Sequence, residues 1–234
     1  MSTLLEILFN PVMGFDKLKK NDTFSFVNLF ITLVVMLFSL ILNAPIKEKA
    51  SMILLSSMNL PNDQIDNMIQ VMYKMRYLQI INGEMLGLAS LVFNSVVIYI
   101  LIIMLKRKMR FKLVFHLIVL ISPILYLGDI INSIMIYIIG INNMSSPYDA
   151  LMFGANKLVP ISSISTILYT FMSYINPFQI WFICLLCIAL RILMKIGYAK
   201  SFAISILFWF ISVALPTLSM YFSDLARDKA ISIL

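Results

Sequence analysis

The sequence predicts an all-α membrane protein, a polytopic bundle of five transmembrane helices. Hydrophobic residues make up 61% of the 234 residues and charged residues 12%, and the mean hydropathy is +0.96. Soluble domains contain about 45–50% apolar and about 25% charged residues, so this composition excludes a soluble globular domain. It also excludes intrinsic disorder, which requires low hydrophobicity.

Five stretches have the length and composition of membrane spans. A helix needs about 20 apolar residues to cross the ~30 Å hydrocarbon core, because it rises about 1.5 Å per residue. The predicted spans are residues 24–42, 85–105, 113–139, 178–194 and 202–220. The third is longer than one straight crossing requires, and Pro123 within it predicts a kink or a break, since proline removes a backbone donor and clashes one turn back.

The basic residues predict how the spans are oriented, because cytoplasmic loops carry an excess of Lys and Arg. With five crossings, the segments on the N-terminal side hold eleven basic and three acidic residues, whereas the opposite segments hold seven of each. This predicts a multi-pass protein of the cell membrane with a cytoplasmic N-terminus and an extracytoplasmic C-terminus. The basic run at residues 106–112 connects two spans. Topology and attraction to anionic lipid explain that run, so nucleic acid is not expected as a partner.

Besides the two short connections at 106–112 and 195–201, four longer segments lie outside the predicted spans. The amphipathic N-terminal segment, residues 1–23, either lies on the inner membrane surface or packs against the bundle. The outer segment, residues 140–177, contains an uncharged stretch at 158–175. A sixth span there would leave only two residues before the next span, so an amphipathic outer-face helix is the better prediction. The outer loop, residues 43–84, and the outer C-terminal tail, residues 221–234, complete the chain.

A methionine-lined helix face is predicted within the outer loop. Apolar residues recur there at helical spacing, after a Pro-Asn-Asp sequence that favours a helix start. They are Ile65, Met68, Ile69, Met72 and Met75. Methionine is flexible and polarisable, which suits a surface that accepts irregular partners. Met68, Met72 and Met75 are therefore candidate partner-binding residues, and the alternative is that this face docks on the protein's own spans or on lipid.

The third span contains most of the candidate functional residues inside the membrane, and the second contains Asn94. Asp129 is the candidate to examine first, because an ionisable residue within a membrane predicts a function. Its candidate neighbours are Asn132, Pro123 and Asn94. Three interpretations stay open. Asp129 is a structural acid bonded to one of these asparagines or to a carbonyl freed by the proline, part of a proton or ion relay, or a contact for a partner.

The sequence predicts no catalytic, metal or cofactor site. Cys184 and Cys187 form a C-x-x-C pair inside the fourth span. Redox pairs need a lowered thiol pKa, and a structural zinc site needs four ligands, which a chain with one histidine does not supply at that depth. These cysteines are therefore expected to be small core residues, and the protein is not expected to be an enzyme.

Three stretches together resemble a known family. They are FNPVMGFDKLKKN (residues 9–21), MRFKLVFHLIVLISPILYLGDIINSI (109–134) and NPFQIWFICLLCIALRILMKIGYAKSFAISILFW (176–209). This layout resembles prokaryotic members of the Yip domain family, named for Ypt/Rab-interacting proteins. The resemblance implies a five-span bundle and a non-catalytic membrane adaptor. The cytosolic Asp-Leu-Tyr-Gly-Pro element of eukaryotic members is absent here, so a Rab-type GTPase is not expected as partner.

Two functions from different classes follow. The first is a non-catalytic adaptor or accessory subunit that binds other integral membrane proteins, with an export or ABC-type transport complex as candidate partner; homo-oligomerisation stays open. The second is a small transporter or permease subunit in which Asp129 and the helix break at Pro123 line an intramembrane path, since broken helices mark substrate sites in transporters.

Overall fold

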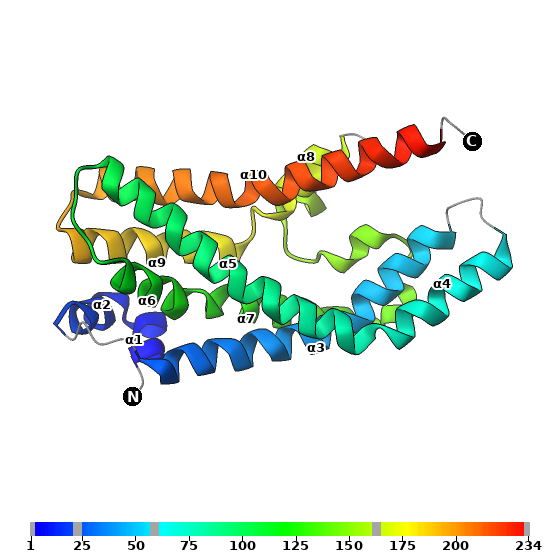
Figure 1. Ribbon diagram of the computed structural model, residues 1–234, viewed down its shortest axis with the longest axis horizontal. Helices are drawn as coiled ribbons and strands as arrows, with labels where there is room; N and C mark the ends of the chain where they lie inside the picture. The colour runs from blue at the N-terminus through cyan, green and yellow to red at the C-terminus, as the bar shows by residue number, and fades with distance from the viewer. Residues whose placement is uncertain (1–2, 21–24, 57–60, 161–164, 232–234) are drawn as a thin grey trace.

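The computed structural model describes residues 3–20, 25–56, 61–160 and 165–231, and within them it contains helices and no strands. Five helical segments of this part of the chain are long and apolar enough to cross a membrane. They are α3 (Phe26–Ser56), α5 (Arg76–Met104), α6 and α7 together (Phe111–Ile139), α9 (Pro177–Met194) and the first part of α10 (Tyr198–Leu215). They run side by side along the molecule (Figure 1). The predicted all-α five-span fold is confirmed.

The third span is broken at the predicted proline. Helix α6 (Phe111–Ile121) ends before Ser122, and α7 (Pro123–Ile139) begins at Pro123. Proline has no N–H, so the Val119 carbonyl four residues earlier loses its usual helical partner. The Thr32 hydroxyl of α3 lies 2.9 Å from that oxygen and donates to it. The break is therefore satisfied by a neighbouring helix, as a bilayer without water requires.

The segment predicted as an outer loop is mostly helical. Helix α3 continues to Ser56, α4 spans Asn62–Lys74, and α5 begins at Arg76. A helix of 31 residues is about 46 Å long and exceeds the ~30 Å hydrocarbon core. Pro45 lies within α3 without ending it, and the nearby Leu42 carbonyl accepts a hydrogen bond of 2.9 Å from Tyr137 of α7. The helix predicted within this segment is present as α4, and the ends of the segment belong to α3 and α5.

The other outer segment consists of short turns. Gly140, with φ of +98°, ends α7, because only glycine adopts that conformation without strain. Three 3-10 turns follow, η1 (Ile141–Asn143), η2 (Pro147–Ala150) and η3 (Ala155–Leu158). The predicted outer-face helix is short: α8 covers Thr166–Ser173, and part of the predicted stretch, residues 161–164, lies outside the described residues. Eight residues span only about 12 Å, too little for a sixth crossing.

The N-terminal helices pack against one end of the bundle. Helices α1 (Thr3–Phe9) and α2 (Pro11–Lys20) lie beside α6 and α9 (Figure 1). Ile7 and Phe15 are fully buried and belong to the main hydrophobic core. Lys19 Nζ donates a 3.0 Å hydrogen bond to the Ile192 carbonyl near the end of α9. Of the two interpretations left open for this segment, packing on the bundle is the one that the structure has.

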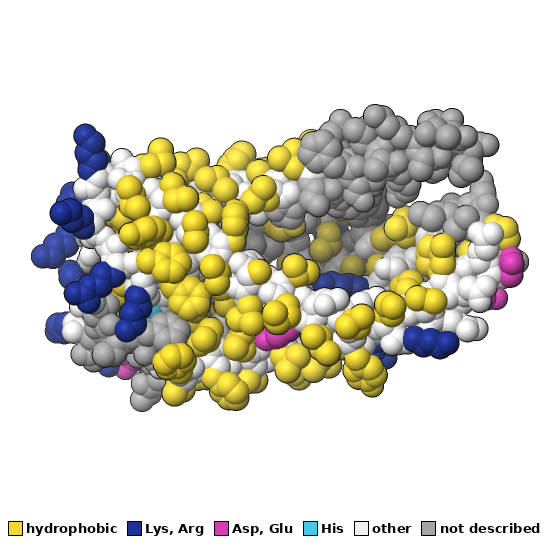
Figure 2. Space-filling model, in the orientation of Figure 1, with side chains coloured by type: hydrophobic (Ala, Val, Ile, Leu, Met, Phe, Trp, Pro, Cys, Tyr) yellow, Lys and Arg dark blue, Asp and Glu magenta, His cyan; other side chains and the backbone are white. Residues whose placement is uncertain are grey.

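Basic side chains gather at the same end of the molecule. Figure 2 shows Lys and Arg concentrated there, where α2, the α5–α6 connection and the α9–α10 turn lie. Hydrophobic side chains cover the flank between the two ends. This distribution is typical of a protein whose basic end faces the cytoplasm, and the orientation itself stays a prediction.

Candidate functional site

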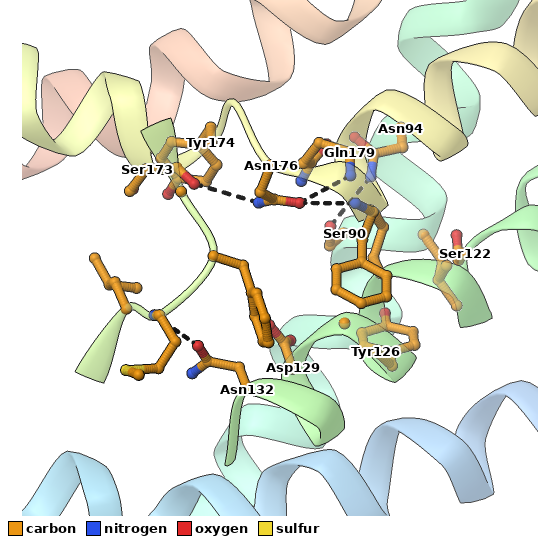
Figure 3. Close-up of a pocket in the computed structure, with 18 residues that line it drawn as sticks. Ser90, Asn94, Ser122, Tyr126, Asp129, Asn132, Ser173, Tyr174, Asn176 and Gln179 are labelled. Atoms are coloured by element: carbon orange, nitrogen blue, oxygen red, sulfur yellow. Dashed lines mark hydrogen bonds between the residues drawn. The ribbon is translucent and has the colours of Figure 1, made fainter. Parts of the chain in front are cut away.

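A polar cavity of about 310 Å³ lies between α5, α7, α9 and the outer segment (Figure 3). Three of the four predicted intramembrane residues line it: Asn94 from α5, and Asp129 and Asn132 from α7. Pro123 is not among its lining residues, but the preceding Ser122 is. Its polar lining also includes residues that the sequence analysis did not single out. They are Ser90, Tyr126, Ser173, Tyr174, Asn176 and Gln179.

One wall of the cavity forms where α7 packs against α9. Gly128 allows their close approach, because a Cβ there would lie 2.6 Å from the Phe178 ring. Asn176 caps α9, and its Oδ1 accepts from the backbone N–H groups of Phe178 at 3.1 Å and Gln179 at 3.0 Å. Its Nδ2 donates to the Ser173 carbonyl at 3.2 Å. An Asn-Pro pair before an apolar run is a helix-start signal, so sequence reasoning could have found this cap.

A roof of irregular chain, residues 150–155, covers the outer side of the cavity. The Asn132 amide binds it twice: Nδ2 donates to the Ala150 carbonyl and Oδ1 accepts from the Met152 N–H, both at 2.8 Å. The Ala155 N–H donates to the Ile175 carbonyl at 2.9 Å. Asn132 therefore joins α7 to the roof, and its amide is not directed at Asp129.

Asp129 is the acid of the cavity. Its side chain is exposed and lines the cavity, and no described side chain donates a hydrogen bond to its carboxylate. Asn94, the other asparagine considered as a partner, donates instead to the Ser90 hydroxyl at 3.3 Å. Across the cavity, burial and then the charge of Asp129 raise the pKa of Tyr174. The carboxylate thus has no hydrogen-bond partner among the described residues, and Lys47 is the cation whose charge acts on it.

The predicted methionine surface, defined by Met68, Met72 and Met75, lies on α4 and at its C-terminal end. Met68 and Met75 are 44% and 48% exposed, and Met72 is half-buried. Helix α4 lies at the end of the molecule opposite the basic end (Figure 1). Val71 and Tyr73 are exposed beside the methionines. The structure therefore leaves most of this apolar surface uncovered by the protein's own described helices.

Lowering the pH is expected to destabilise the loop at residues 145–149, which precedes the roof, because the Asp149 carboxylate accepts hydrogen bonds within it. Burial raises the pKa of Asp149, but the N–H groups of Ser145 and Ser146, the Ser145 hydroxyl and Lys157 outweigh it, and the pKa is lowered. Because the pKa of Asp149 is lower in the folded protein than its unfolded value of 3.8, the ionised carboxylate stabilises the fold above pH 3.8. This stabilisation is lost as the pH falls through the pKa of the folded state. The side chain is 38% exposed, so the gain is below about 1 kcal/mol.

Amide hydrogen exchange at Ser145 and Ser146 measures this effect. Exchange, corrected for its intrinsic pH dependence, should accelerate as the pH falls below 3.8 and not between pH 5 and 7. An Asp149→Asn variant should show the fast exchange at every pH. Equal protection in that variant at pH 6 would contradict the assignment.

One comparison with known proteins identifies a family. The family model described as the Yip1 domain matches residues 5–220, which includes the five candidate spans and every residue of the cavity. No curated protein and no solved structure matches the chain.

Proposed function

The chain belongs to the Yip1 domain family, and on that basis we propose that it is a non-catalytic adaptor or accessory subunit that binds other integral membrane proteins. The family is one of non-enzymatic membrane proteins. We further propose that it lies in the cell membrane with its N-terminus in the cytoplasm. The partner that we propose for it is an export or ABC-type transport complex.

The observation that carries this proposal is the exposed methionine surface. Helix α4 follows α3, which is longer than a bilayer crossing needs, and this length supports the proposal that the α4 surface lies outside the hydrocarbon core. Exposed apolar area in water costs free energy unless a partner covers it. Its opposite face carries Asp66, Asn67, Gln70 and Lys74. An amphipathic helix whose apolar face is exposed and made of flexible methionine side chains is better suited to contact with a protein partner than to contact with water.

Replacing the three methionines by glutamine is expected to release the partner. Glutamine keeps the size and the helix propensity of methionine but removes the apolar contact. Two or three contact residues at about 1 kcal/mol each should lower partner recovery at least about tenfold. The measurement is co-purification in mild detergent with quantitative mass spectrometry.

A matched control uses the other side of the same helix. Asn67→Gln and Lys74→Gln together should leave recovery unchanged, and all variants should keep the elution volume of the native protein. Unchanged recovery with the methionine variant, or equal loss with the control, would contradict a partner site on α4.

The transporter alternative receives less support from the geometry. A conduit needs a path from the cavity to the basic end of the molecule. Below the cavity, α6 contributes five consecutive fully buried side chains to the core, from Leu117 to Ile121. This dense packing of α6 separates the cavity from the basic end of the molecule.

A further inference from the structure

A second, smaller cavity adjoins the polar cavity. The second cavity has a volume of about 160 Å³ and lies between α5, α9 and α10. The two share five lining residues: Ser90, Asn94, Leu125, Tyr174 and Gln179. The two cavities therefore adjoin at these five residues, and the pair, here called the joined cavity, differs in character from end to end.

The larger end has the chemistry of an ammonium site. The Asp129 carboxylate shares it with four aromatic side chains, Tyr126, Phe153, Tyr174 and Phe178. Phe153 and Phe178 meet edge to face, with ring centroids 6.1 Å apart. Aromatic faces attract organic cations, most strongly where water is excluded. A carboxylate without a bonded partner supplies the matching charge.

The smaller end is apolar but contains two unused donors. Phe182, Phe208 and Val213 line it. The buried Trp209 Nε1 and Ser212 Oγ, which also line it, have no hydrogen-bond partner among the described residues. A buried donor without an acceptor destabilises the structure, so an oxygen-bearing ligand at this end is favoured.

We propose that the joined cavity binds the headgroup of an amine-bearing phospholipid. Its ammonium group lies at Asp129 among the aromatic rings, and its phosphate or ester oxygens accept from Trp209 and Ser212. An acyl chain begins in the apolar end, between α9 and α10. A free amine would bind only at the Asp129 end of the joined cavity. A lipid in the leaflet nearer the roof binds at both ends, and it enters the cavity from between the spans. This proposal is independent of the methionine surface.

Tryptophan quenching by brominated lipids tests the proposal on the full chain in nanodiscs. The chain has two tryptophans, and Trp181→Phe removes the exposed one so that Trp209 alone reports. Brominated phosphatidylethanolamine should quench Trp209 more than brominated phosphatidylglycerol at the same mole fraction. Asp129→Asn in this background should weaken the preference for ethanolamine lipid about tenfold, the effect of losing a desolvated charge partner.

Two further variants and competition by a soluble amine serve as controls for this experiment. Asp63→Asn makes the same charge change on exposed α4 and should leave the preference intact. Tyr126→Leu keeps the charge, removes one ring and should weaken binding severalfold, which covers the case in which Asp129→Asn fails to fold. Equal quenching by both lipids would overturn the proposal. So would full competition by free ethanolamine, which would identify a water-soluble amine as the ligand.

Discussion

A Gly154→Ala variant is expected to displace the roof of the cavity and to destabilise it by about 2 kcal/mol. A Cβ at this position would lie 2.6 Å from Ser173 Cα and 2.8 Å from the Ser173 carbonyl oxygen, and also 2.1 Å from Asn156 Oδ1. Backbone atoms cannot rotate away as a side chain can, so the two segments must separate. Overpacking of this kind typically costs about 1–3 kcal/mol.

Hydrogen exchange at Ala155 measures this displacement directly, because its N–H bonds to the Ile175 carbonyl between the same two segments. A loss of about 2 kcal/mol corresponds to roughly 30-fold faster exchange. Gly197→Ala is the matched control, since a Cβ there meets nothing within 4 Å. Native exchange rates in Gly154→Ala would show that the roof tolerates the methyl group.

The parts of this fold that could be predicted follow local rules. A run of about 20 apolar residues is recognised as a span from its length alone, because a helix of that length matches the thickness of the bilayer core. Pro123 predicts the break because a proline ring excludes a helical hydrogen bond wherever it occurs. Asp129 could be singled out because charge inside a membrane is costly. Each of these inferences uses one residue and its immediate neighbours.

The parts that could not be predicted depend on contacts between distant residues. Thr32 and Val119, or Gly154 and Ser173, are brought together only by the packing of whole helices. No spacing rule links Asp129 to Tyr174, so the composition of the cavity was not foreseeable from the sequence. The hydrogen bond from Tyr137 of α7 to the Leu42 carbonyl of α3 is another contact of this kind.

The pairing of Glu48 with Arg76 is another such long-range contact, and it holds the outer ends of α3 and α5 together. Arg76 Nε donates to Glu48 Oε1 at 2.6 Å, and Nη2 donates to Oε2. The Glu48 side chain is 5% exposed and that of Arg76 37%. Two parallel hydrogen bonds between a guanidinium and a carboxylate fix the relative orientation of the two side chains and also strengthen their contact. This pair therefore positions the start of α5, directly after the methionine surface.

Arg76→Met is expected to destabilise this outer hairpin by about 2 kcal/mol, because it leaves a buried carboxylate without its partner. Removing one member of a fully buried pair costs about 3–5 kcal/mol, and the partial exposure of Arg76 lowers that figure by solvent screening. The double variant Glu48→Met/Arg76→Met removes both charges and should be closer to the native protein than the single variant. Thermal unfolding of all three proteins in one detergent measures the difference. A double variant less stable than Arg76→Met would mean that the Glu48 carboxylate is satisfied elsewhere, and that the methionine surface does not depend on this pair for its position.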